Sequence, residues 1–277
     1  MKAEDNPKIN SLLRYLTSKL NIESVLCYGS YGAGLQDKNS DVDILILLDK
    51  LPSSAQLHEL YKGIPYVKNI EEKDLRHWDN VWTLHNTALE IEDLKIEVGY
   101  NTLAWVKKVI KKLIQDNQIS FKEFSFRPYT FLGLLEHSAC IYDRHDFIKN
   151  VKSNIRPFPL GLKKEIVKSF LPILNDCYED LVDNLQRDIG ILAYQFQVFV
   201  GMDALIQLLW VINDVYDPAS KRTEFYLYKL KSLPNDFKEF IQVALANSYV
   251  NKKEFIDAFE KVKLFLEEKL SELKFIE

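Results

Sequence analysis

Three of the nine glycines in this 277-residue chain fall within six residues, at positions 29, 32 and 34. They directly follow a short, largely apolar segment, residues 24–28, and a second apolar segment comes soon after, at residues 42–48. Short apolar runs bounded by glycine and polar residues are typical of buried β-strands. The sequence therefore predicts two buried strands that are connected through a glycine-rich turn.

The turn and the start of the second strand carry groups that suit a metal-bound phosphate. Glycine lets backbone N–H groups approach an anion closely, and the start of a helix adds a favourable dipole. Asp41 and Asp43 stand two apart on the predicted strand, so both side chains project from one face. Two such carboxylates repel each other unless a cation lies between them, and oxygen ligands suit Mg²⁺ held jointly with nucleotide phosphates. The combination indicates metal-assisted phosphoryl or nucleotidyl transfer.

The same segment carries a family resemblance. Tyr28-Gly29-Ser30 is followed, after ten intervening residues, by Asp41-Val42-Asp43-Ile44. This arrangement resembles the signature of the polymerase-β-type nucleotidyltransferase superfamily, in which an apolar-Gly-Gly/Ser turn precedes an Asp-apolar-Asp/Glu-apolar strand. The predicted strand, turn and strand around the residues agree with that signature. The alternative is a plain glycine-rich turn between two buried strands, with aspartates at a solvated strand start.

The resemblance implies a role for each matched position. It implies that Asp41 and Asp43 coordinate Mg²⁺ and that Gly29 and Ser30 hold the triphosphate of an NTP. Ser40, which directly precedes the first aspartate, is also common at this place in the superfamily, and we count it among the nucleotide-binding residues. With two ions, one activates the attacking hydroxyl while the other stabilises the leaving pyrophosphate.

The superfamily also places a third carboxylate on a later strand of the same sheet. Residues 94–100 alternate apolar and polar side chains, and Glu97 lies on the polar face. We predict that Glu97 completes the metal site or helps to deprotonate the acceptor. Glu90 and Glu92 are the reserve candidates if the predicted register is off by one hairpin. The alternative for Glu97 is a solvated strand carboxylate that pairs with a cross-strand lysine.

The hydrophobic spacing changes along the chain. In the first part it predicts helices at residues 8–20 and 102–114, and further strands at 82–91 and 94–100. Beyond about residue 119 helical spacing dominates, and it predicts helices at 129–138, 162–174, 178–200, 202–213 and 255–273. We therefore expect an α/β (α+β) nucleotidyltransferase domain with a small mixed sheet over residues 1–120, followed by an all-α helical domain over residues 121–277.

The segment of residues 189–212 is long and apolar enough to be a candidate membrane-spanning helix. The segment also holds three glutamines and an aspartate, whose side chains would be costly at the centre of a bilayer. We predict a buried helix, or two helices joined near Gly201, and no membrane association. The aromatic residues of the segment that we expect to be buried are Tyr194, Phe196, Phe199 and Trp210.

A second, weaker resemblance lies in the helical half. Residues 141–143, 149–159 and 211–221 look like the C-terminal halves of antibiotic-type nucleotidyltransferases, which attach a nucleoside monophosphate to a hydroxyl of an aminoglycoside or lincosamide. It suggests Lys221 as a ligand of the triphosphate and Asp188 as a guess for a base from the helical domain. The alternatives are a surface lysine and an ion pair between Asp188 and the preceding arginine.

Composition limits the compartment and the partners. Lys and Arg total 36 against 40 Asp and Glu, and the net charge of −4 gives no footprint for non-specific nucleic-acid binding. The three cysteines form no C-x-x-C pair, and the first ten residues hold no apolar run, so we expect no disulfide, no signal peptide and a cytoplasmic location.

Together these observations predict a Mg²⁺-dependent nucleotidyltransferase. It would transfer NMP, most often AMP from ATP, to a hydroxyl of a small molecule such as an antibiotic, with release of pyrophosphate. Two alternatives stay open: an enzyme that modifies a protein or an RNA, and a non-catalytic, antitoxin-like module of the same fold that binds a partner protein. The sequence leaves the oligomeric state open, a homodimer included.

Overall fold

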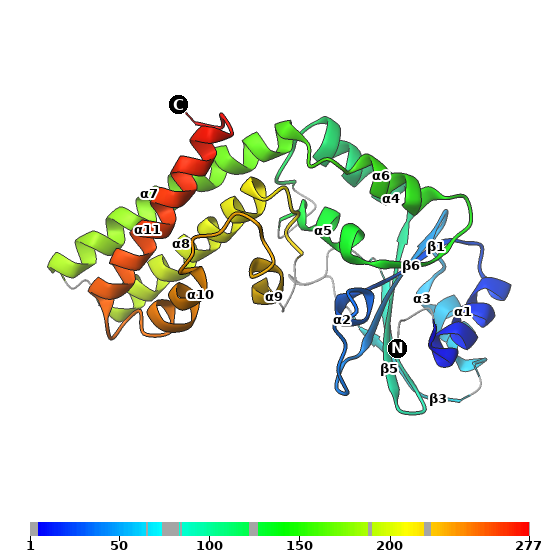
Figure 1. Ribbon diagram of the computed structural model, residues 1–277. Helices are drawn as coiled ribbons and strands as arrows, with labels where there is room; N and C mark the ends of the chain where they lie inside the picture. The colour runs from blue at the N-terminus through cyan, green and yellow to red at the C-terminus, as the bar shows by residue number, and fades with distance from the viewer. Residues whose placement is uncertain are drawn as a thin grey trace. The chain divides into compact units, whose positions relative to one another are not determined.

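A computed structural model describes residues 5–64, 66–73, 83, 85–121, 127–187, 190–218 and 223–276 (Figure 1). The chain divides into two compact units. The first runs to Pro157 and also includes Pro218, and the second takes the rest of the chain from Phe158 onward. The first unit contains the sheet, whereas the described residues of the second unit form helices and turns.

The described residues of the first unit form a six-stranded mixed sheet in the order β3-β4-β5-β2-β1-β6. Only the β2–β5 pair is parallel, and the other four neighbouring pairs are antiparallel. The strands are β1 (Ile22–Tyr28), β2 (Val42–Leu48), β3 (Val67–Lys73), β4 (His85–Ile91), β5 (Leu94–Thr102) and β6 (Ala139–Asp143). The small mixed sheet that the sequence predicts is confirmed.

The helices of the first unit begin with α1, which is stabilised at its start by the side chain of Asn6. Its Oδ1 accepts a hydrogen bond from the backbone N–H of Lys8 at 3.0 Å, and Pro7 occupies the first helical position. The helices are α1 (Pro7–Lys19), α2 (Gly29–Gly32), α3 (Ser54–Lys62), α4 (Leu103–Ile110), the π-helix η2 (Lys111–Gln115), α5 (Thr130–His137) and α6 (Phe147–Asn154).

Apolar side chains from α1, α3 and one face of the sheet form the core of the first unit. Ile44 and Ile46 of β2 and Val98 of β5 belong to this core, together with Leu12 of α1 and Tyr61 of α3. Because side chains alternate along a strand, the residues between them point to the opposite face. Strand β2 is buried on both faces over most of its length, as its nearly continuous apolar sequence predicts.

The first unit extends beyond the domain boundary expected at residue 120. Strand β6 pairs antiparallel with β1, and α6 also contacts both strands. Neither face of β6 is fully buried, so its residues lack the alternating apolar pattern by which strands are recognised. The expected boundary therefore falls inside the first compact unit, and an all-helical segment from residue 121 onward does not describe β6.

The second unit is built on three long helices that pack against one another, α7, α8 and α11. Helix α7 continues through Pro172, so it joins the segment predicted at 162–174 to the first part of the one predicted at 178–200. The helices of this unit are α7 (Leu160–Arg187), α8 (Ile191–Ile212), α9 (Thr223–Leu227), α10 (Phe237–Glu239), the π-helix η3 (Phe240–Leu245) and α11 (Lys252–Glu272).

Gly201 lies inside α8, which is one continuous helix and not two. A Cβ atom at this position would lie 3.1 Å from Cζ of Phe259 and 3.2 Å from Cβ of Cys177. The missing side chain therefore lets α8 pack closely against α7 and α11, and it does not end the helix. The helix is therefore continuous at the position where the sequence allows a break.

The burial of the aromatic residues on α8 is confirmed for two of the four. Tyr194 and Trp210 are buried, but the expectation for the other two is wrong: Phe196 is 64% exposed and Phe199 is 73% exposed. They lie on the face of α8 opposite Tyr194 and Val198. Among the described helices, α8 alone is long and apolar enough to cross a membrane, but more than half of that window is buried within the chain, as in a core helix.

Replacement of a core aromatic of α11 should destabilise the second unit. Phe259 is fully buried and its ring lies 5.7 Å from that of Phe255 and 6.3 Å from that of Phe240. We expect Phe259→Ala to lower the free energy of unfolding by about 3–5 kcal/mol because it leaves a cavity. Leu264→Ala on the same helix is the control: Leu264 is 56% exposed and the loss should stay below about 1 kcal/mol. Urea unfolding followed by circular dichroism measures both, and equal losses would contradict this packing.

Candidate active site

Asp43 and Glu97 lie side by side on neighbouring parallel strands. The register pairs Asp43 of β2 with Glu97 of β5, and it pairs Tyr28 of β1 with Asp43. These three residues form a row across the middle of the sheet, on the face opposite to the one that carries Ile44 and Val98 into the core. Two carboxylates therefore meet on the face that α1 and α3 do not cover.

Asp41 stands just before β2 and belongs to the same group. It is exposed, whereas Asp43 and Glu97 are half-buried. Burial raises the pKa of the Tyr28 phenol well above its usual value, and the charges of Asp43, Glu97 and Asp41 raise that pKa further. A single phenol thus experiences all three carboxylates, so the site carries a concentrated negative charge.

The carboxylates have the right chemistry for Mg²⁺ but are not gathered around one point. Among the described residues, no three Asp, Glu, His or Cys side chains lie close enough together to hold a metal ion. Like charges repel and keep carboxylates apart in the absence of a cation. The set nevertheless consists of oxygen donors only, the ligands that Mg²⁺ prefers, and the strand register holds two of the three at adjacent positions.

The glycine turn passes directly against the Asp43 carboxylate. Helix α2 begins at Gly29, whose backbone is left-handed with φ of 62°. A Cβ atom on Gly29 would come closer than 3.0 Å to Oδ2 of Asp43, and one on Gly32 would come equally close to the carbonyl oxygen of Cys27. A side chain at position 29 would have to displace the Asp43 carboxylate, and one at position 32 would meet the backbone of β1, so glycine lets the turn pack closely at both places.

Ser30 and Ser40 occupy the turn and the loop that leads into β2. The carbonyl oxygen of Ser30 accepts a hydrogen bond from the backbone N–H of Leu35 at 2.8 Å. Oγ of Ser40 accepts from the backbone N–H of Asp37 at 2.9 Å and donates to Oδ1 of Asp37 at 3.2 Å. Ser40 therefore braces the loop just before Asp41. A contact between either serine and a nucleotide stays a prediction.

The two reserve carboxylates lie farther from the centre of the site. Glu90 of β4 is opposite Lys95, on the carboxylate face but two strands and one row away from Asp43. Glu92 is in the turn between β4 and β5, where its Oε2 is 2.8 Å from Nζ of Lys8 in an ion pair. Glu97 is therefore the better placed of the three to act with Asp43.

Two predicted residues, Lys221 and Asp188, lie outside the described residues. Their roles as a triphosphate ligand and as a base stay predictions. The neighbour of Asp188, Arg187, pairs within α7: its Nε is 2.9 Å from Oδ1 of Asp183. Asp183, one helical turn before Arg187, therefore competes with Asp188 for the guanidinium of Arg187.

Cys27 is next to the site but is not a nucleophile. Burial raises the pKa of its thiol to about 12, and the charge of Asp43 contributes to the rise. Because the thiolate is the reactive form, the side chain is unreactive near neutral pH. Cys27 is a buried residue of β1.

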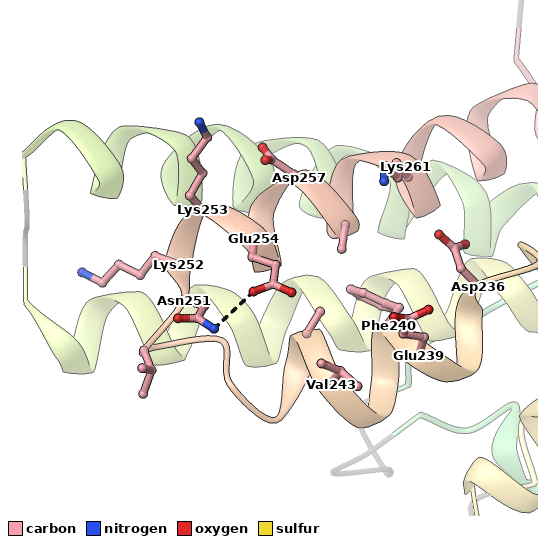
Figure 2. A pocket seen from close by; sticks show the side chains of 13 residues that line it. Asp236, Glu239, Phe240, Val243, Asn251, Lys252, Lys253, Glu254, Asp257 and Lys261 are labelled. Carbon is pink, nitrogen blue, oxygen red and sulfur yellow. Dashed lines mark hydrogen bonds between the residues drawn. The ribbon is translucent and has the colours of Figure 1, made fainter.

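A groove of about 760 Å³ lies in the second unit, between η3 and α11 (Figure 2). Phe240 and Val243 line its apolar part. Asn251 donates a hydrogen bond to Glu254 at 3.2 Å at its edge, and Lys252 extends away from Glu254 in Figure 2. None of its lining residues belongs to the carboxylate row, so the groove is not assigned to the same site.

Comparison with known proteins identifies the domain that carries the site. Residues 9–116 match the family described as a nucleotidyltransferase domain, and this range includes the glycine turn, Asp41, Asp43 and Glu97. Among solved structures, the chain is similar to a nucleotidyltransferase-like protein from Exiguobacterium sibiricum 255-15, with 10% sequence identity and a TM-score of 0.42. That alignment covers 94% of this chain and 72% of the other. No curated protein matches the sequence significantly.

A side chain at Gly29 should destabilise the chain by more than the cost of its left-handed backbone, because it also meets Asp43. Gly29→Ala and Gly34→Ala both place a side chain on a left-handed backbone, with φ of 62° and 70°, which costs about 1–2 kcal/mol. Only the Cβ at position 29 would also meet Asp43, since no described atom lies within 4 Å of the one at position 34. We expect Gly29→Ala to lose about 1–3 kcal/mol more in urea unfolding. Equal losses would contradict the close approach of the turn to Asp43.

Proposed function

We infer from the nucleotidyltransferase domain at residues 9–116 that this chain transfers a nucleoside monophosphate group from an NTP. We further propose that the reaction depends on Mg²⁺, that ATP is the donor and AMP the transferred group, and that the acceptor is a hydroxyl of a small molecule. The observation that carries the proposal is the register that pairs Asp43 with Glu97 next to the Gly29 turn, inside the matched domain.

In this proposal Asp41, Asp43 and Glu97 hold the metal. When bound, Mg²⁺ would neutralise charge on the triphosphate and make the acceptor hydroxyl more acidic. The mutual repulsion of the carboxylates favours occupation of the site, because a cation relieves it. Their oxygen-only donor set agrees with this ion.

The chain's own groups then divide the remaining tasks. The backbone of the turn at Gly29 and Ser30 holds the triphosphate, as close packing without side chains allows. Glu97 accepts the proton of the acceptor hydroxyl, whose oxygen forms a bond to the α-phosphorus. The bond from that phosphorus to the bridging oxygen breaks, and pyrophosphate leaves with the electron pair.

The charge of the chain supports a small acceptor over a nucleic acid. The net charge is −4, and the charges of three carboxylates act on the Tyr28 phenol at the site. A polyanion would be repelled by such a surface unless a local basic groove compensated for it. An antibiotic hydroxyl is one acceptor of the proposed class.

Nucleotide-dependent thermal shifts test the proposed donor site. We expect ATP with Mg²⁺ to raise the Tm of the native chain, since a ligand present at a hundred times its Kd adds about 2.7 kcal/mol of stability. Asp43→Asn should lose the Mg²⁺-dependent part of the shift. Glu92→Gln is the control because Glu92 is engaged with Lys8 in the hairpin turn, and it should keep the shift.

Parallel scans with GTP, CTP and UTP identify the preferred base. A shift that survives in Asp43→Asn would contradict the metal-binding role of that residue. Loss of the shift in Glu92→Gln would move the third carboxylate from Glu97 to the hairpin turn.

A further inference from the structure

Asn86 of β4 carries a buried amide to which no described residue forms a hydrogen bond. The residue is only 5% exposed, and neither Oδ1 nor Nδ2 has a partner among the residues that the structure describes. Buried side-chain amides in folded proteins are almost always hydrogen-bonded, because an unpaired buried polar group costs free energy. A ligand that supplies the missing bonds would explain why this position holds asparagine.

The strand register places Asn86 on the carboxylate face. In the β4–β5 pair, Ala88 is opposite Glu97 and Asn86 is opposite Gly99. Asn86 is therefore the diagonal neighbour of Glu97, on the same face, at a distance that side chains or a small ligand can bridge. The two residues that complete this diagonal pairing are small: Gly99 is opposite Asn86, and Ala88 is opposite Glu97.

Thr83 closes the site over Gly99. A Cβ atom on Gly99 would come closer than 3.0 Å to Cγ2 of Thr83, so the threonine occupies the space that a side chain at position 99 would need. Thr83 is itself buried. The amide of Asn86 is consequently shielded from bulk water while it remains next to the carboxylates.

The strand order puts Asn86 on the acceptor side of the site. The order β4-β5-β2-β1 places Asn86 beyond Glu97 at one end and the glycine turn, which follows β1, at the other. In an in-line displacement the attacking hydroxyl and the leaving pyrophosphate lie on opposite sides of the phosphorus. If the turn holds the phosphates, the acceptor approaches from the side of β5 and β4.

We propose that Asn86 binds the acceptor through a hydroxyl or amino group adjacent to the hydroxyl that is attacked. The inference rests on the proposed function and adds the class of acceptor, a polyhydroxyl or amino-hydroxyl compound. A carboxamide offers both a donor and an acceptor, and a neighbouring hydroxyl can satisfy either. Asn86 thereby orients the reacting hydroxyl toward Glu97.

Stability of the unliganded chain is the first test. Asn86→Leu keeps the branched shape and removes both unpaired polar atoms, so we expect Tm to rise by roughly 2–4 °C. Asn101→Leu is the matched control: Asn101 is buried on the same face of β5, but its Oδ1 accepts a hydrogen bond from the backbone N–H of Thr102 at 2.8 Å. Its replacement should lower Tm. A lower Tm for both Asn86→Leu and the smaller Asn86→Ser would show that the amide is already bonded and would overturn the inference.

Acceptor choice is the second test, with glycerol and 1-propanol as probes. Glycerol has a hydroxyl next to the one that reacts, and 1-propanol has none. The native chain, supplied with ATP, Mg²⁺ and equal amounts of both alcohols, should form more glyceryl-AMP than propyl-AMP, as measured by mass spectrometry. In Asn86→Leu this preference should fall about tenfold, the equivalent of one lost hydrogen bond.

The outcomes separate the two proposals. An unchanged preference in Asn86→Leu overturns the role of Asn86 and leaves the proposed function in place. AMP formed by hydrolysis without either ester keeps the donor chemistry and overturns the polyol class of acceptor. Formation of neither AMP nor an ester by the native chain overturns the proposed function, and the inference falls with it.

Discussion

The parallel pairing of β2 with β5 is the constraint on which the site depends. It sets Asp43 beside Glu97, although 53 residues of chain separate their positions. Side chains alternate with a period of two, so a slip of one residue would turn Glu97 into the core and Val98 out of it. The apolar face that packs against α1 and α3 therefore holds the register, and the register holds the carboxylates. The packing that stabilises the core therefore also fixes the relative positions of the carboxylates.

The glycine turn adds a second constraint from the other side of Asp43. Gly29 brings the backbone against the carboxylate, while Gly32 lets α2 fold back onto the end of β1 at Cys27. Either side chain would force the turn away from the sheet. A phosphate held by this turn is consequently close to the carboxylates whatever the acceptor is, which separates donor binding from acceptor choice. The acceptor is then selected by groups on β5 and β4, where Asn86 lies.

Much of the first unit could be predicted from the sequence because its signals are local. The apolar runs of β1 and β2, the glycine spacing and the alternation around Glu97 each depend on a few adjacent residues. Strand β6 could not be predicted, since it has only five residues, none of them is buried, and its sequence does not alternate between apolar and polar side chains. Pairing with β1 makes these residues a strand. The exposure of Phe196 and Phe199 could not be predicted either. Helix α8 is apolar on all sides, so its sequence does not indicate which face is buried. Asn86 is visible only through the register, because a lone asparagine in a strand indicates nothing by itself.

The site contains two features that oppose the stability of the free chain. The carboxylates of Asp41, Asp43 and Glu97 act together on one phenol, and the Asn86 amide is buried without a described partner. Neither feature contributes to folding, and an apolar side chain at position 86 would leave no unpaired polar atom there. Functional sites are where such conflicts with stability are expected, because a preorganised group must stay unsatisfied until its ligand arrives. A cation would relieve the first conflict and an acceptor the second, so the two unfavourable features point to two separate ligands on either side of Glu97.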